Sequence, residues 1–470
     1  MAIAGVIGPG VFIGMGNALH AGGPVGLLVG FSIVGILVMV MMGCIGEMNT
    51  MFDFNFNTHS ARWVEPSFGA AIGWSYILIW ICNIIAEYVS ATSVLSFYST
   101  KVPMYGYYLI LWGTFSVYQM FGVDVFGEVE FILAWIKLLF ITGFYLFAVI
   151  FAAGGIPNHS PGNPFKEYPL ANGFKGIANS FVYAGIFYTG IESLSMTFLE
   201  LKNVKKAVRT AVRQTIFRII YVYFGITITY GITVPWNDEG LSTENKTLRS
   251  PMTIALIKAG WTNAGYFVTT MIFITCLSSI NSAIYFCARS LTRLAVDGYA
   301  PQIFTKVTKS GVPWVSTQTV HLFGFLSLLA MDSSSAVAYN YIVSLGGISA
   351  FIVWTGVVFA HYRFRKGWIL QGNSLDDLPF KLPLFPYLNY IAIFLGALLC
   401  LVLGWSTLKP FDAGSFVDLY IMLPIFFLMW IVFKVLFKTK WIKYTEMDFQ
   451  SGRVDVNDSG VFETKTSLES

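Results

Sequence analysis

Long apolar segments with few charged residues recur along most of the chain. A stretch of about twenty such residues is the length that crosses the hydrocarbon core of a bilayer. The clearest examples are residues 24–47 and 69–97, and the weakest is 315–331. The pattern predicts an all-α integral membrane protein with about twelve transmembrane helices, centred at Phe12, Leu37, Leu78, Leu111, Phe140, Phe187, Ile226, Phe273, Phe323, Phe351, Leu398 and Leu428.

The composition supports this class of protein. Of the 470 residues, 56% are hydrophobic and 11% are charged, so a soluble fold would have too few polar residues to cover its surface. The five cysteines lie in apolar segments without the spacing of metal ligands, and we expect them to be small buried residues. The sequence shows no phosphate-binding loop, zinc-type cluster or nucleophile elbow, so we expect neither an enzyme nor a bound cofactor or metal.

Lysine and arginine residues gather in alternate connections between the predicted spans. They include Arg209 and Arg213 after the sixth span, Arg289 and Arg293 after the eighth, and Arg363 after the tenth. Because cytoplasmic connections carry the excess of Lys and Arg, this distribution predicts that both termini are cytoplasmic. The basic residues form no stripe of the kind that binds nucleic acid. We expect residues 439–470 to form a disordered cytoplasmic tail.

The first predicted span carries five glycines and one proline within residues 5–16, GVIGPGVFIGMG. Glycines in a membrane helix can serve close helix packing. Alternatively, Gly8-Pro9-Gly10 places a residue without an N–H group between two weak helix formers, which favours a break in the helix. A break exposes backbone groups that a membrane tolerates only where they line a cavity or bind a ligand.

The sixth predicted span contains a second candidate break. Residues 183–192, YAGIFYTGIE, interrupt an apolar helix with polar groups and two glycines. The first and sixth spans are corresponding members of two five-helix halves, a pattern typical of transporters with an inverted repeat and paired discontinuous helices. The N–H and carbonyl groups at two such breaks suit the carboxylate and ammonium groups of an α-amino acid.

An ordered set of motifs extends from the first span to about residue 443. It comprises residues 5–31, the GEM of residues 46–48, RWVEPSFGAAIGW, GEVEFILAWIKLLFITGF, the GIE of the sixth span, SSINSAIYFCARSLTRLAVDGYAPQIF and HYRFRKGWILQGNSLDDLPFK. These motifs resemble those of the fungal amino acid permeases, which belong to the amino acid–polyamine–organocation superfamily. The resemblance implies twelve spans, a leucine-transporter-type core made of the first ten, and proton-coupled uptake of amino acids across the plasma membrane.

The same resemblance divides the chain into two repeats and an extension. Residues 1–153 correspond to the first repeat, 174–361 to the second, 386–438 to the last two spans and 439–470 to the tail. Members of the family have a first half-helix before the glycine break, whereas only residues 1–4 precede Gly5 here. We therefore expect that an upstream segment is missing. Whether the chain without this half-helix transports normally is left open.

The resemblance also assigns substrate-binding residues, and no catalytic ones, at the two breaks. In this family Ser or Thr is usual where Pro9 stands, and Thr is usual where Ile191 stands. At Pro9 the lost hydroxyl and N–H would weaken binding by about 1.5–3 kcal/mol unless neighbouring amides compensate. The assigned residues are Ile7, Gly8, Pro9 and Gly10 for the carboxylate, and Tyr188, Thr189, Gly190, Ile191 and Glu192 for the ammonium group and side chain.

Ionisable residues within predicted spans are costly and are therefore candidates for function. Lys137 is assigned to proton coupling, because a lysine at this point of the superfamily can replace the ion of sodium-driven relatives. Alternatively, it extends toward the membrane interface and Glu130. Glu87 belongs either to the pocket or a proton relay, or to a structural pair. Glu192 can cap freed amides or touch substrate, and Glu47 is expected to be a helix-end or gate contact.

The sequence therefore predicts a secondary active permease that imports amino acids across the plasma membrane by proton symport. Its expected partners are amino acids, protons and the lipid bilayer, and not nucleic acid. Two alternatives stay open. The same pocket would serve a non-transporting amino acid receptor, and the departures at the first break would suit a truncated, inactive permease.

Overall fold

The computed structural model describes residues 7–198, 204–243, 248–331, 336–408 and 410–453. The start of the chain, on which the expectation of a missing half-helix rests, lies outside the described residues, as do residues 454–470 of the predicted tail. The described part of the chain is helical and has no β-strand, only two isolated β-bridges. The all-α expectation is therefore confirmed for these residues.

Seven described helical segments are long and apolar enough to cross a membrane, and a bent pair makes an eighth. The centres of other expected spans fall in shorter helices: α4 (Met104–Tyr118), α7 (Phe174–Tyr188) and α15 (Tyr387–Val402). The eight segments lie in α1 (Gly14–Met51), α3 (Pro66–Tyr98), α5 (Val123–Ala152), α9 (Val204–Arg218) with the π-helix η3 (Ile219–Phe224) and α10 (Gly225–Thr233), α12 (Ala264–Val296), α13 (Trp314–Leu322) with η6 (Phe323–Met331), α14 (Ala336–Leu370), and the pair α16 (Ala413–Tyr420) and α17 (Met422–Phe437).

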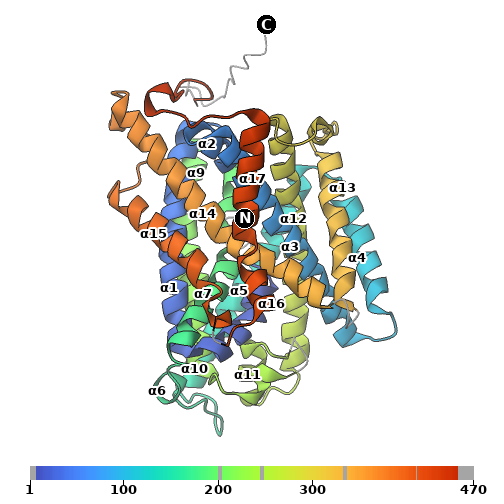
Figure 1. The fold of residues 1–470 in the computed structure, drawn as a ribbon. Coiled ribbons are helices and arrows are strands. Elements are labelled where there is room, and N and C mark those ends of the chain that lie inside the picture. Colours follow the sequence, from blue (N-terminus) through green and yellow to red (C-terminus); the bar gives the residue numbers. More distant parts are fainter. Residues whose placement is uncertain (1–6, 199–203, 244–247, 332–335, 409, 454–470) are drawn as a thin grey trace.

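Short helices cover the two ends of the bundle. In Figure 1, α2 lies at one end together with the C-terminal segment, and α6 and α11 lie at the opposite end. The short elements are α2 (Phe56–Trp63), α6 (Pro164–Glu167), α8 (Leu194–Phe198), α11 (Pro251–Lys258), and the 3-10 turns η1 (Pro9–Val11), η2 (Ile191–Ser193), η4 (Glu239–Ser242), η5 (Gln302–Thr305), η7 (Leu375–Asp377), η8 (Trp405–Thr407) and η9 (Tyr444–Glu446).

A sharp kink inside α1 separates the first predicted span from the second. Gly23 has φ 69° and ψ 173°, and the next residue, Pro24, has no N–H group to continue the helix. The N–H of Val25 donates instead to the carbonyl of Pro169, at 3.0 Å. A Cβ atom on Gly23 would lie 2.7 Å from the backbone nitrogen of Ala171. The kink therefore requires glycine both for its backbone conformation and for the close approach of this loop.

The centre of the molecule is formed by α1, α3, α7, α12 and α14. Helix α1 packs along α7, while α3 packs against both α12 and α14. The contacts are made by buried apolar and aromatic side chains, among them Phe31, Trp80 and Trp354. All five cysteines are buried, as the sequence predicts. This arrangement brings the start of α1, the end of α7 and one face of α3 toward the same region.

The described part of the predicted tail, residues 439–453, contacts the helices. Met447 and Phe449 are buried, and the ring of Phe449 stacks on Trp63 with the centroids 5.2 Å apart. Arg62 forms an ion pair with Asp448 at 3.2 Å. These apolar side chains find a hydrophobic surface on α2 and α14, which the polar composition of the tail does not reveal.

A buried carboxylate joins the start of α3 to the end of α17. Lys434 Nζ lies 2.9 Å from Oε1 of Glu65, and the hydroxyl of Thr439 donates to the same oxygen at 2.7 Å. Burial alone would raise the pKa of Glu65, but the hydrogen bonds from Lys434, Thr439 and Ser67 outweigh it and hold the pKa below its ordinary value.

The lowered pKa of Glu65 predicts a pH-dependent contribution to stability. The contact should stabilise the fold above the ordinary carboxyl pKa, and that stabilisation should be lost as the pH falls through the lower folded-state pKa. Glu65→Gln should lower the free energy of unfolding at pH 7 by about 1.5–3 kcal/mol, the range for hydrogen bonds to a charged group, and by less in acid. Thermal unfolding of the detergent-purified protein across pH measures this.

Glu446→Gln is the matched control, because Glu446 is 58% exposed and pairs with Lys443 at the surface. Such pairs contribute little. Equal losses of stability in the two variants would contradict the role given to Glu65.

Candidate functional site

The chain leaves the helical conformation at Thr189 and Gly190, inside the stretch where the sequence predicts the second break. Helix α7 ends at Tyr188, and Thr189 follows with φ −54° and ψ 139°. Gly190 has φ 98°, in the left-handed region that favours glycine. The short turn η2 then leads into α8. The backbone groups at this point consequently lack their usual helical partners.

Glu192 caps this break. Its carboxylate accepts the backbone N–H of Gly190 at 3.1 Å on Oε1 and 3.2 Å on Oε2. The indole N–H of Trp354, on α14, donates to Oε2 at 3.0 Å. Glu192 is fully buried. Of the two roles that the sequence left open, the observed contacts are those of the cap.

The first predicted break is also irregular as far as it is described. Gly8 is extended, with φ −92° and ψ 177°, and η1 forms a single turn before α1 begins at Gly14. The N–H of Phe12 donates to the carbonyl of Pro9 at 3.0 Å. This segment therefore enters α1 through a turn rather than as a continuous helix.

Tyrosine hydroxyl groups satisfy one backbone carbonyl at each irregular segment. The hydroxyl of Tyr223 donates to the carbonyl of Phe187 at 2.7 Å. The hydroxyl of Tyr230 donates to the carbonyl of Val11 at 3.2 Å. Both tyrosines belong to the continuous segment η3–α10, which thus supports the two irregular segments together.

The two irregular segments border one cavity of about 180 Å³. The residues that they contribute to its wall are Gly8, Pro9, Gly10 and Val11 from the first, and Ile186, Phe187 and Thr189 from the second. The other residues assigned by the resemblance do not line the cavity but are buried beside it, namely Ile7, Tyr188, Gly190, Ile191 and Glu192.

One face of α3 forms a further wall of the cavity. Trp80, Asn83, Glu87 and Ser90 all line it, and their spacing of three or four residues places them on the same side of a helix. Sequence reasoning selected Glu87 because of its charge and missed the other three. The sequence does contain a pattern that could have identified them, because these polar and aromatic residues recur with helical periodicity inside an apolar span.

Glu87 lies directly beside the first irregular segment. A Cβ atom on Gly8 would be 3.0 Å from Oε1 of Glu87 and 3.2 Å from the hydroxyl of Ser279. Ser279 comes from α12 and also lines the cavity. The second carboxylate oxygen, Oε2, is buried and has no hydrogen-bond partner among the described residues. This oxygen is therefore available to a donor group on a ligand.

Lys137 lies outside the cavity wall, between α5 and α12. Its Nζ donates to the hydroxyl of Ser278 at 2.6 Å and lies 3.7 Å from Oε1 of Glu130. The hydroxyl of Ser278 donates in turn to Glu130. Both charged side chains are buried. Lys137 thus reaches Glu130 inside the protein rather than extending to an exposed interface.

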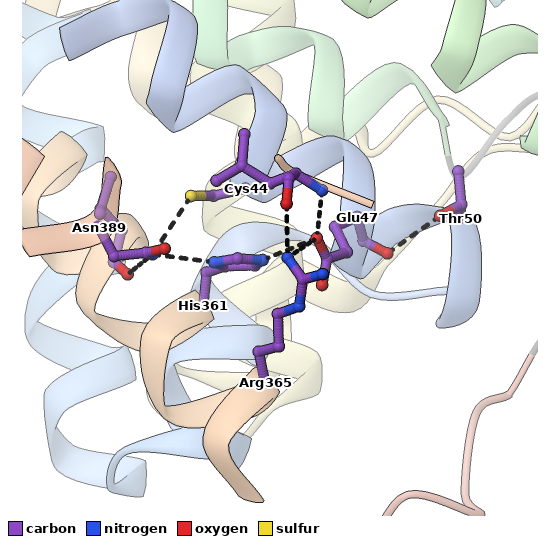
Figure 2. Close-up of polar contacts among 8 residues, drawn as sticks. Cys44, Glu47, Thr50, His361, Arg365 and Asn389 are labelled. Carbon is purple, nitrogen blue, oxygen red and sulfur yellow. Dashed lines mark hydrogen bonds and ion pairs between the residues drawn. The ribbon is translucent and has the colours of Figure 1, made fainter. Parts of the chain in front are cut away.

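Another polar cluster lies away from the cavity, near the end of α1. Figure 2 shows His361 and Arg365 of α14 directed toward Glu47, with Asn389 of α15 beside His361. Nε2 of His361 and Nη1 of Arg365 each lie 3.2 Å from Oε2 of Glu47. The backbone N–H of Leu382 donates to the same oxygen at 2.6 Å. Glu47 is therefore a helix-end contact that ties α1 to α14 and to the chain before α15.

These features define a class of protein. A multi-pass membrane protein with a cavity between two irregular helical segments is typical of secondary transporters. The comparison with known families is more specific, because a family model described as amino acid permease matches residues 1–445. The chain belongs to this family, whose members are transporters and not enzymes, and the resemblance inferred from the motifs is confirmed.

Individual relatives agree with this assignment. The chain is 62% identical over 453 residues to an uncharacterized amino-acid permease of Schizosaccharomyces pombe. This alignment covers 96% of this chain and 84% of the relative. It is 42% identical over 436 residues to a general amino acid permease of Saccharomyces cerevisiae, covering 92% and 78% of the two chains. A second general permease of that yeast is 31% identical over 479 residues, covering 97% and 79%.

The cap at the second break generates a prediction about stability. Glu192→Ala removes the acceptor for the buried N–H of Gly190, so it should destabilise the protein by about 1–3 kcal/mol, the penalty of an unsatisfied buried group. Glu192→Gln keeps an acceptor oxygen and should retain most of the stability. Thermal unfolding in detergent compares the variants. An alanine variant as stable as the unmodified protein would refute the capping role.

Proposed function

We propose that the chain is a secondary active transporter that imports amino acids across the plasma membrane by proton symport. One observation carries the proposal: residues of both irregular segments and the carboxylate of Glu87 line the same cavity. Paired discontinuous helices around a central site are the arrangement that transporters use for small charged substrates. The relatives support the substrate class, since two of them are general amino acid permeases.

The geometry suits the two charges of an α-amino acid. These charges sit on groups attached to one carbon atom, so their binding partners must lie close together. Oε1 of Glu87 is 3.0 Å from the Cβ position of Gly8, which meets this requirement. We propose that Oε2 of Glu87 accepts the ammonium group, while the amides of Gly8 and Gly10, in the turn that leads into α1, bind the carboxylate. Pro9 has no N–H to offer.

The remaining assigned residues are proposed to hold the shape of the two irregular segments. Glu192 caps Gly190, and the hydroxyl of Tyr188 donates to the carbonyl of Phe31 on α1 at 3.1 Å. Ile7 and Ile191 are fully buried apolar contacts. Thr189 lines the cavity and remains the proposed contact to substrate in the second segment.

Proton coupling is proposed for Lys137 and Glu87. Lys137 bonds Ser278, and the next residue, Ser279, lines the cavity beside Glu87. Loss of the proton from Lys137 would leave the carboxylate of Glu130 without its cation, which is costly in a buried site. The contact between α5 and α12 would then loosen, and the cavity wall formed by α12 would move with it.

The architecture proposed for this function has twelve spans. Residues 1–153 and 174–361 form the two inverted repeats, 386–438 the last two spans, and 439–470 the tail. The meeting of one irregular segment from each half supports the repeat. The end of the bundle that carries α2 is proposed to face the cytoplasm together with both termini, because Arg62, Arg293 and Arg363 make their contacts there.

Uptake of radiolabelled amino acids by cells that lack competing permeases tests the proposal. Cells that express the chain should accumulate amino acid. Gly8→Ala should reduce uptake about tenfold or more, because its methyl group crowds Glu87 and Ser279 and overpacking costs about 1–3 kcal/mol. Gly113→Ala is the control, since a Cβ atom there meets nothing within 4 Å.

No accumulation by protein that reaches the plasma membrane would contradict transport and favour a receptor. Equal uptake by the Gly8 and Gly113 variants would contradict the placement of the site.

Removal of Lys137 tests the coupling. Lys137→Ala should abolish accumulation driven by a proton gradient while exchange of amino acid across the membrane continues. The measurement is uptake into vesicles with and without a pH gradient. Because this change leaves Glu130 uncompensated, the double variant Lys137→Ala, Glu130→Gln is made as well, since it restores local neutrality. Gradient-driven accumulation that survives in both variants would rule out the role of Lys137.

A further inference from the structure

We infer that the cavity selects amino acids with neutral side chains, and that Asn83 is the residue that sets this selectivity. The inference rests on the proposed function, because it takes the cavity as the substrate site. It goes further in naming the chemical class of substrate and a residue that the family resemblance did not assign.

The first observation is the charge of the cavity wall. Among the described residues that line it, Glu87 is the one charged side chain. The nearby ionisable residues Lys137, Glu130 and Glu192 do not line it, and each is held by contacts elsewhere. The rest of the wall is apolar or carries neutral polar groups such as Asn83, Ser90 and Ser282.

Charge balance then limits the substrate. The ammonium group common to all α-amino acids uses Glu87, which leaves the wall without a second carboxylate for the cation of lysine or arginine. An acidic side chain would need a cation, and Lys137 bonds Ser278 instead of facing the cavity. A charge placed in an enclosed site without a partner is strongly disfavoured. Neutral side chains are the ones that leave no charge unpaired.

The second observation is the position of Asn83. It precedes Glu87 by four residues on the same face of α3, which is about 6 Å along the helix axis at roughly 1.5 Å per residue. A substrate whose ammonium group meets Glu87 would thus reach Asn83 with its side chain. Oδ1 of Asn83 has no hydrogen-bond partner among the described residues. This oxygen is placed to accept a hydrogen bond from a side-chain amide or hydroxyl group.

The uncharged amide of Asn83 therefore stands where a carboxylate would admit a basic substrate. Asn83→Asp keeps the shape of the side chain and adds the missing negative charge. Asn83→Leu keeps the same branching of non-hydrogen atoms, removes the hydrogen-bonding group and adds no charge. The two variants separate the effect of charge from the effect of altering the wall.

The experiment measures uptake of radiolabelled glutamine, leucine, lysine and glutamate by the full chain, with the amount of each variant at the cell surface determined in parallel. The unmodified protein should take up glutamine and leucine at least tenfold faster than lysine or glutamate. Asn83→Asp should raise the ratio of lysine to leucine uptake about tenfold. Asn83→Leu should leave this ratio unchanged and reduce glutamine uptake relative to leucine.

The outcomes distinguish this inference from the function on which it rests. Uptake of lysine or glutamate by the unmodified protein as fast as leucine would overturn the neutral selectivity and leave amino acid transport intact. An unchanged lysine to leucine ratio in Asn83→Asp, with leucine uptake retained, would overturn the role of Asn83. Uptake of no amino acid at all would instead overturn the proposed function.

Discussion

Every peptide group that leaves helical pairing inside a membrane must find another partner, because hydrocarbon offers none. The structure meets this constraint at both irregular segments with side chains, one from the second segment itself and two from η3–α10. Glu192 accepts the N–H of Gly190, and the hydroxyl groups of Tyr223 and Tyr230 donate to carbonyls at the two segments. The cavity exists because these supports hold the backbone open. Its shape therefore depends on residues that do not line it.

Buried charged side chains also need partners inside the protein, for the same reason. Lys137 is held with Glu130 through Ser278, and Glu47 is surrounded by Arg365, His361 and the N–H of Leu382. Compensated groups of this kind tie helices together and leave little capacity for a ligand. One oxygen of each of these carboxylates, and one of Glu87, has no hydrogen-bond partner among the described residues. Glu87 differs because it lines the cavity, whereas Glu47 and Glu130 do not. A charged side chain that is both buried and incompletely bonded, beside a cavity, is the feature that separates a binding site from a structural contact.

The candidate site was predictable in part, and the reasons differ from residue to residue. Gly8 and Thr189 were found because glycine, proline and polar residues interrupt apolar spans, and Glu87 because charge is rare in such spans. Glu192 stood out by the same criterion, yet nothing local to the sequence distinguishes a cap from a substrate contact. Asn83 was missed because a neutral amide in a membrane helix usually serves packing between helices. Its partner-free oxygen becomes visible only once α3 is seen against the cavity.

The sequence by itself determined the class of this protein. Hydrophobic length, scarcity of charge and the order of its motifs are properties of the linear chain, and they are enough to identify a membrane permease. Helical periodicity also settles which residues share a face, as with Trp80, Asn83 and Glu87 on α3. Which helix that face meets was decided only by the tertiary structure, since contacts between segments far apart in the chain depend on how all the helices pack together. That packing places Glu87 against Gly8, brings the indole of Trp354 to Glu192, and stacks Phe449 of the tail on Trp63 of α2.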